Sequence, residues 1–132
     1  MTLTLKKELK DISRSELLFL NKQIIKVLKK LFGKKKNIKV RTTARGSKSS
    51  YGCYSPCENT IYINRNTCSN IDRYVSTLIH EWRHSRQKGL KKNYLPLERM
   101  YGYMNNPYEV DARMYEKKYR PLVWKMVKEK LK

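Results

Sequence analysis

The sequence predicts an α+β fold in which helices pack on a small, mostly antiparallel sheet. Its 132 residues are expected to form one domain, since domains span about 100–200 residues. Apolar residues recur at helical spacing near both ends of the chain, and three short runs of strand composition lie between them. Glycine, proline and asparagine residues break those runs, which is typical of a small sheet with turns.

A basic N-terminal helix is expected over residues 13–32. Ser13 and Glu16 have the Ser-x-x-Glu spacing of a capping box, in which each side chain bonds the other residue's backbone N–H. Gly33 is a typical residue at the end of a helix. The apolar positions recur every three or four residues: Leu17, Leu20, Ile24, Leu28 and Leu31.

The middle of the chain has strand composition over residues 37–43, 50–54 and 60–64. The last of these, Thr60-Ile61-Tyr62-Ile63-Asn64, is rich in β-branched and aromatic residues. We expect these strands to open a core region that extends over residues 37–118.

A second helix is expected to begin at Ser69 or Asn70 and to end before Gly89. Its apolar stripe consists of Val75, Leu78, Ile79 and Trp82. Residues 90–105 are then expected to form a long connection, with a short turn of helix over 97–101 as an alternative. Loops of this length in a compact domain are often functional.

A third helix is expected to start at Asn106-Pro107 and to run towards Arg120. Asparagine is a good N-cap, and proline suits the first helical position because no N–H is needed there. Pro121 is expected to begin a separate C-terminal helix over residues 121–131.

The sequence His80-Glu81-Trp82-Arg83-His84 is an H-E-x-x-H motif, and it contains both histidines of the chain. On a helix, residues four apart lie within roughly 40° of one another, so both imidazoles can reach one metal ion. Glu81 then lies beside the metal, where it can act as a general base on a water molecule. The competing interpretation is a helix with two solvated histidines.

A catalytic zinc ion needs a third protein ligand, and Glu109 is the preferred candidate. Glu109 lies in the first turn of the helix that starts at Asn106, and Glu116 lies two turns further along the same face. Asp111 is a candidate partner for the outer N–H of a ligand histidine. Glu98 is the reserve candidate for the ligand. Helix capping alone would also account for acidic residues in a first turn.

In these motifs the chain resembles a minimal zincin-like metallopeptidase domain of the gluzincin type. A strand precedes the H-E-x-x-H helix, and a later helix carries the glutamate. This order is similar to that of the small zincins of phage and large viruses and of the ImmA/IrrE and SprT-like families. The resemblance covers roughly residues 50–118. It implies a zincin-like fold, one zinc ion held by His80, His84 and Glu109, and Glu81 as general base.

The resemblance also implies that the strand Ile61–Asn64 is the edge of the cleft and pairs with an extended peptide substrate. An oxyanion donor is needed as well. Tyr101, Tyr103 and Tyr108 lie in the right stretch of the sequence, and Arg83 is a further candidate. Each tyrosine is also explained by packing alone.

The three cysteines, Cys53, Cys57 and Cys68, are a rival metal site. A closed structural zinc site needs four ligands, so free thiols are the preferred interpretation. The odd cysteine count and the lack of a signal-peptide core predict an intracellular, reducing compartment rather than secretion. The longest apolar run is only a few residues, which predicts no membrane-spanning helix.

The net charge of +20 favours anionic partners. Residues 17–57 contain eleven basic residues and no acidic one. They include the run Lys34-Lys35-Lys36 and Lys39, Arg41, Arg45 and Lys48, with Tyr51 and Tyr54 available for stacking on nucleic-acid bases. A solvated, lysine-rich face is the competing explanation.

The sequence therefore predicts a zinc-dependent metallopeptidase that acts on a protein or peptide. Two alternatives remain open. The first is a basic nucleic-acid-binding protein that uses zinc structurally or not at all. The second is a non-catalytic zincin that binds a protein partner without cleaving it.

Overall fold

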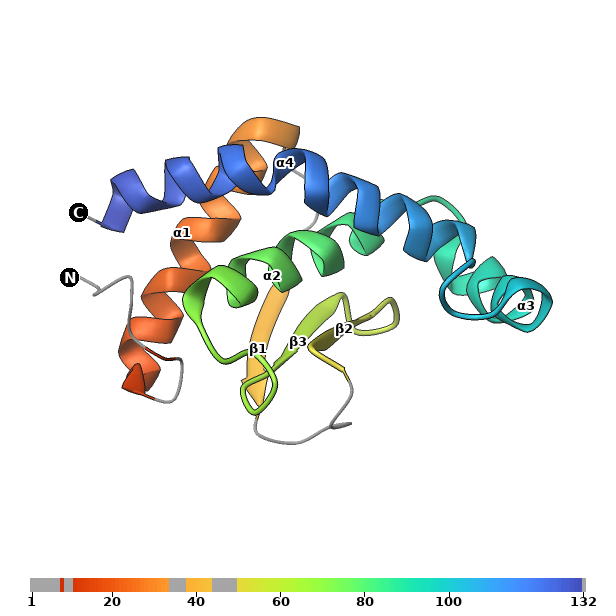
Figure 1. Cartoon of the computed structure of the whole chain (residues 1–132), viewed down its shortest axis with the longest axis horizontal. Helices are drawn as coiled ribbons and strands as arrows, with labels where there is room; N and C mark the ends of the chain where they lie inside the picture. Colours follow the sequence, from red (N-terminus) through yellow and green to blue (C-terminus); the bar gives the residue numbers. More distant parts are fainter. Residues whose placement is uncertain (1–7, 9–10, 34–37, 44–49, 132) are drawn as a thin grey trace.

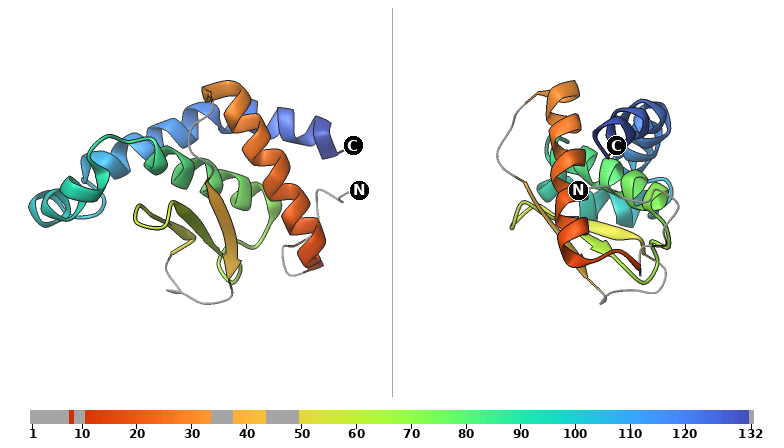
Figure 2. Two further views of the ribbon diagram at one scale, coloured as in Figure 1. Left: turned by 180° about the vertical axis from the view of Figure 1, so that it is seen from behind. Right: turned by 90° about the vertical axis from the view of Figure 1, so that its left-hand side faces the viewer.

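The computed structural model describes residues 8, 11–33, 38–43 and 50–131. Within these ranges the fold is α+β, with four helices and one three-stranded sheet. Helix α2 lies between the sheet and the long helix α4, and α1 crosses α4 (Figures 1 and 2). Helix α3 lies at the opposite end of the molecule (Figure 1). The elements run α1 (Arg14–Phe32), β1 (Lys39–Thr43), β2 (Gly52–Ser55), β3 (Thr60–Asn64), α2 (Ile71–Ser85), α3 (Leu90–Tyr101) and α4 (Pro107–Leu131).

The sheet is mixed rather than mostly antiparallel, which corrects the expectation from the sequence. Its strand order is β1-β3-β2, with β3 parallel to β1 and antiparallel to β2. Four of the five β3 residues are buried, whereas β1 and β2 are largely half-exposed. The most apolar strand therefore takes the centre, and the chain crosses over it between β1 and β2.

The central place of β3 also shows that the expected cleft edge is wrong. Ile61–Asn64 pairs on both sides, so its backbone groups are committed within the sheet. Among the described strands, β2 is the edge strand beside α2.

The first two helices begin as the capping residues predict. The Ser13 side chain accepts a bond from the Glu16 N–H, and the Glu16 side chain accepts one from the Ser13 N–H, which confirms the capping box. Gly33 follows α1 with a φ of 87°, a conformation that favours glycine. The Asn70 side chain caps α2 by accepting from the Arg73 N–H.

Two prolines lie inside helices, one of them Pro121, which was expected to begin a separate helix. Pro96 is within α3, so residues 90–101 are helical instead of a long connection, and Pro121 is within a continuous α4. An internal proline removes one hydrogen bond to the carbonyl four residues earlier. Those carbonyls belong to the exposed residues Lys92 and Lys117, where water can replace the lost donor.

One hydrophobic core joins α1, α2, β3 and the second half of α4. It includes the predicted stripe of α2, with Val75, Leu78 and Ile79 fully buried and Trp82 2% exposed. No helix in the described part of the chain is both long and apolar enough to cross a bilayer. The predicted basic positions Lys34–Lys36, Arg45 and Lys48 lie outside the described residues.

Candidate metal centre

Helix α2 presents His80, Glu81 and His84 on the side that faces α4 and the rim of the sheet. Its apolar stripe anchors the helix in the core, so the positions of these three side chains are fixed by packing. One ligand atom from each of the three lies within 4.8 Å of the others. Among the described residues, His80, Glu81 and His84 are the side chains whose ligand atoms lie close enough together to hold one metal ion.

Helix α4 supplies Glu109 from its first turn. The Asn106 side chain accepts from the Tyr108 N–H and donates to the Tyr94 carbonyl, which fixes the start of the helix. The fully buried Ala112 is small enough for α4 to lie close to its neighbours. As a result, Glu109 Oε1 lies 2.9 Å from His80 Nε2 and 3.1 Å from His84 Nε2.

The electrostatics of this cluster follow from its burial. Glu81 is 5% exposed, and burial raises the pKa of its carboxyl group to about 7, although both histidines lower it. Burial lowers the pKa of His80, but hydrogen bonds to Glu109 and Glu116 outweigh it and raise the value to about 10. Burial opposes ionisation of Glu109 too, but its bonds to His80 and His84 dominate and lower its pKa.

The Nδ1 atoms of the two histidines, which face away from Glu109, have different partners. His80 Nδ1 lies 3.2 Å from Glu116 Oε2, and His84 Nδ1 lies 2.7 Å from Gln87 Oε1. The structure thus places Glu116 and Gln87 where Asp111 was expected. Asp111 instead accepts hydrogen bonds from Arg83 and from the amide of Gln87.

The tyrosine that contacts the cluster is Tyr94, which the sequence analysis missed. Its hydroxyl donates to Glu109 Oε2. Of the three predicted tyrosines, only Tyr103 lines the cavity at the cluster, and burial together with the nearby Glu109 and Glu81 charges raises its pKa to about 12. Tyr108 donates to the Lys88 carbonyl. Tyr101 is 51% exposed and is not part of the cavity wall.

A cavity of about 930 Å³ opens onto these side chains. Residues 50–54, which include the first three residues of edge strand β2, form one wall, and α3 with the following turn forms the other. This second wall includes the apolar side chains of Leu90, Leu95 and Met104, together with Lys91 and Tyr94. Arg83 and Glu98, which the sequence offered as reserve candidates, do not line it.

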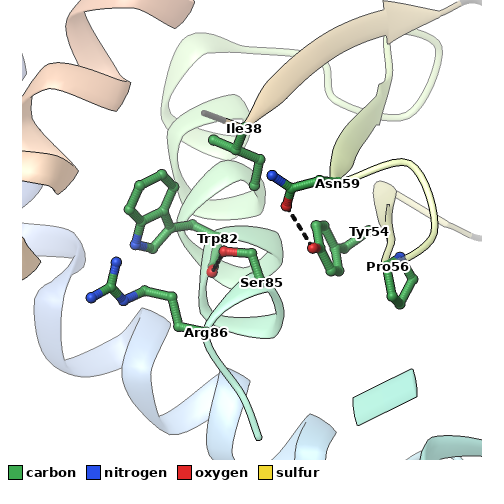
Figure 3. Close-up of a pocket in the computed structure, with 7 residues that line it drawn as sticks. All are labelled: Ile38, Tyr54, Pro56, Asn59, Trp82, Ser85 and Arg86. Atoms are coloured by element: carbon green, nitrogen blue, oxygen red, sulfur yellow. Dashed lines mark hydrogen bonds between the residues drawn. The ribbon is translucent and has the colours of Figure 1, made fainter. Parts of the chain in front are cut away.

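A second cavity of about 500 Å³ lies on the other side of α2, between Trp82, Arg86 and the β2–β3 turn (Figure 3). The Tyr54 hydroxyl donates to Asn59 Oδ1 at its wall. None of the candidate metal ligands lines this cavity.

The cysteines do not gather into a rival site. Cys68 is buried in the core, whereas Cys53 and Cys57 are exposed on the wall of the large cavity. All three thiols are free.

Comparisons with known proteins give no match: no family model, no curated protein and no solved structure matches this chain.

Proposed function

We propose that the chain is a zinc-dependent metallopeptidase. The observation that carries the proposal is the convergence of two imidazole nitrogens, His80 Nε2 and His84 Nε2, on one carboxylate oxygen of Glu109. Two histidines and one glutamate form a ligand set that is typical of catalytic zinc sites, which keep a fourth position open. The donor set on α2 and α4 therefore fits zinc.

The large cavity gives the cluster access to a ligand. His80, Glu81, His84 and Glu109 all line it, so a bound ion would lie at its wall rather than in a closed site. Zinc in this position supplies a Lewis acid that activates water and polarises a carbonyl group.

Glu81 is the proposed general base. Its pKa of about 7 is close to the operating range of a proton-transfer group near neutral pH. Its Oε1 lies 3.7 Å from His84 Nε2, beside the ligand atoms. Tyr103 is the proposed oxyanion donor, because it is the predicted tyrosine that lines the cavity.

The substrate is proposed to be an extended peptide that pairs with β2. Strand β2 bonds to β3 on one side and lies in the cavity wall, in place of the expected Ile61–Asn64. An extended chain can add to such an edge through backbone hydrogen bonds.

Zinc content and hydrolysis test this function in two steps. The purified chain is expected to hold about one zinc ion, and His84→Ala is expected to lose it. Glu81→Gln is expected to keep zinc and to lose cleavage of a peptide library. The proposal would be contradicted if His84→Ala held as much zinc as wild type. It would also be contradicted if wild type and Glu81→Gln cleaved the peptides equally.

A second candidate function, polyanion binding, is favoured by one surface of α4. Lys117, Lys118, Lys125 and Lys128 are exposed and fall within about 100° of the helix circumference. With a net charge of +20, such a row of lysines favours phosphate backbones. The polyanion-binding function would be supported if the chain binds double-stranded DNA with an affinity that falls steeply with salt. The affinity should fall further when these four lysines are replaced by glutamine. Binding that is insensitive to salt or to these substitutions would contradict it.

A further inference from the structure

A chain of hydrogen bonds lies behind His84, on the side away from Glu109. Gln87 follows His84 by about one helical turn, and its Oε1 lies 2.7 Å from His84 Nδ1. The other end of the Gln87 amide, Nε2, lies 2.8 Å from the Tyr108 carbonyl oxygen and 2.8 Å from Asp111 Oδ2.

These contacts fix which way the Gln87 amide points. A carbonyl oxygen and an ionised carboxylate only accept hydrogen bonds, so the amide atom that faces both of them must be the nitrogen. The amide oxygen is then the atom that faces His84. Because an oxygen of this kind cannot donate, His84 Nδ1 must carry the hydrogen. Nε2 is left as the ring nitrogen that can give a lone pair to a metal ion.

Asp111 is itself held by Arg83. Arg83 Nε and Nη2 donate to the two Asp111 oxygens at 2.7 and 3.3 Å, and the guanidinium lies 4.8 Å from the centre of the Tyr115 ring. The positively charged Arg83 guanidinium donates to both Asp111 oxygens and so favours Asp111 as a carboxylate that accepts hydrogen bonds. The bonds from Arg83 to Asp111 and from Gln87 to Tyr108 and Asp111 also join the region of α2 to α4.

His80 has a different partner at its Nδ1 atom. Its Nδ1 donates directly to the Glu116 carboxylate at 3.2 Å. The two histidines therefore differ in their outer acceptor, which is a charged carboxylate for His80 and a neutral amide for His84.

We propose that Gln87 is a positioning residue that holds His84 with the hydrogen on Nδ1, and that Arg83 and Asp111 act through Gln87. This inference rests on the proposed zinc site. It gives one role to three side chains from α2, from the segment that follows α2 and from α4, including the arginine inside the H-E-x-x-H motif. Partners of this kind commonly alter metal affinity about 10–100-fold when they are removed.

The first test replaces Gln87 by methionine, which has a similar length but no amide. Gln23→Met is the matched control, because Gln23 is the other glutamine of the chain and lies half-buried in α1. Zinc alone is titrated against a chromophoric chelator. Gln87→Met is expected to bind zinc 10–100-fold more weakly than wild type, and Gln23→Met is expected to match wild type.

Nitrogen-15 NMR of the zinc-loaded chain reads the position of the hydrogen directly. We expect a slowly exchanging Nδ1–H signal from His84 in wild type and in Gln23→Met. In Gln87→Met this hydrogen is expected to exchange faster with water, because its acceptor is gone. A general loss of stability would not confine the change to the His84 ring.

A pair of further variants tests the orientation argument. Gln87→Glu faces the Asp111 carboxylate across the present 2.8 Å contact, so its zinc affinity should fall at least tenfold. Adding Asp111→Asn supplies an amide that can donate to the new carboxylate. The double variant should regain part of that affinity, because the Tyr108 carbonyl oxygen still faces the carboxylate. Wild-type affinity in Gln87→Met, or no recovery in the double variant, would overturn the inference. In those outcomes wild type still binds zinc, whereas wild type without zinc would overturn the proposed function as well.

Discussion

The imidazole of His80 and the carboxylate of Glu109 meet at 2.9 Å between Nε2 and Oε1, although 29 positions separate them in the sequence. The contact brings the middle of α2 against the first turn of α4. It therefore joins the H-E-x-x-H motif to a residue that no local pattern ties to it. The same Glu109 oxygen lies 3.1 Å from His84 Nε2, so one carboxylate serves both rings.

Glu109→Gln should weaken zinc binding by at least tenfold. The substitution keeps the shape of the side chain but removes the negative charge, and an amide is a poorer zinc ligand than a carboxylate. Glu98→Gln is the matched control, since Glu98 lies on α3 outside the cavity wall. The measurement is competition with a chelator at fixed pH, and equal affinity in both variants would remove Glu109 from the ligand set.

The metal-free Glu81→Gln variant should become more stable relative to the metal-free wild type as the pH rises. Burial holds the pKa of Glu81 at about 7 in the folded state, against about 4.5 unfolded. The folded state therefore binds an extra proton between these two pH values, so wild type loses stability as the pH rises from about 4.5 to about 7. Glutamine does not titrate, and the variant escapes a loss on the order of 3 kcal/mol.

Urea unfolding at a series of pH values, in the presence of a chelator, measures this difference. The two proteins should differ by a constant amount below about pH 4.5, and the gap should grow in favour of Glu81→Gln up to about pH 7. A gap that is independent of pH would show that the pKa of Glu81 is the same in the folded and unfolded states, and would remove the raised pKa on which its role as a base is argued.

Tyr94→Phe should weaken zinc binding several-fold, most strongly at acid pH. The Tyr94 hydroxyl donates to Glu109 Oε2 and helps to lower the pKa of Glu109. Without it, protons compete better with zinc for the carboxylate. Tyr101→Phe is the control, because the Tyr101 side chain is 51% exposed and lies outside the cavity wall. Identical zinc affinities for the two variants between pH 5 and 8 would contradict this role.

Local chemistry explains what the sequence predicts well. The capping box at Ser13, the Asn70 cap and the apolar stripe that ends at Trp82 all act within a turn or two of helix. The spacing of His80 and His84 is likewise a property of one helix. The choice of Glu109 depended on a helix start at Asn106, and the structure brings its carboxylate to both histidines.

What the sequence does not predict depends on contacts between elements. Tyr94 reaches Glu109 only because α3 lies against the start of α4, and nothing near Tyr94 in the sequence indicates this. Gln87 had a local signal, since three residues after His84 is about one helical turn, but its partners lie on α4. The order of the strands depends on how well each is buried in the assembled fold, which strand composition alone does not show.

Pro121→Ala should stabilise the fold by about 1–3 kcal/mol. Pro121 is exposed in the interior of α4, where proline is about 3 kcal/mol less favourable than alanine. Part of the stability gained by Pro121→Ala is offset, because alanine gives the unfolded chain more conformational entropy than proline does. The alanine N–H restores the bond to the Lys117 carbonyl. Core residues that follow Pro121, such as Val123 and Val127, hold the helix in place despite it. Thermal unfolding measures the gain, and Lys125→Ala, at an exposed position of the same helix, is the control. A lower melting temperature for Pro121→Ala than for wild type would contradict the prediction. It would mean that α4 bends at Pro121 and that the core needs the bend.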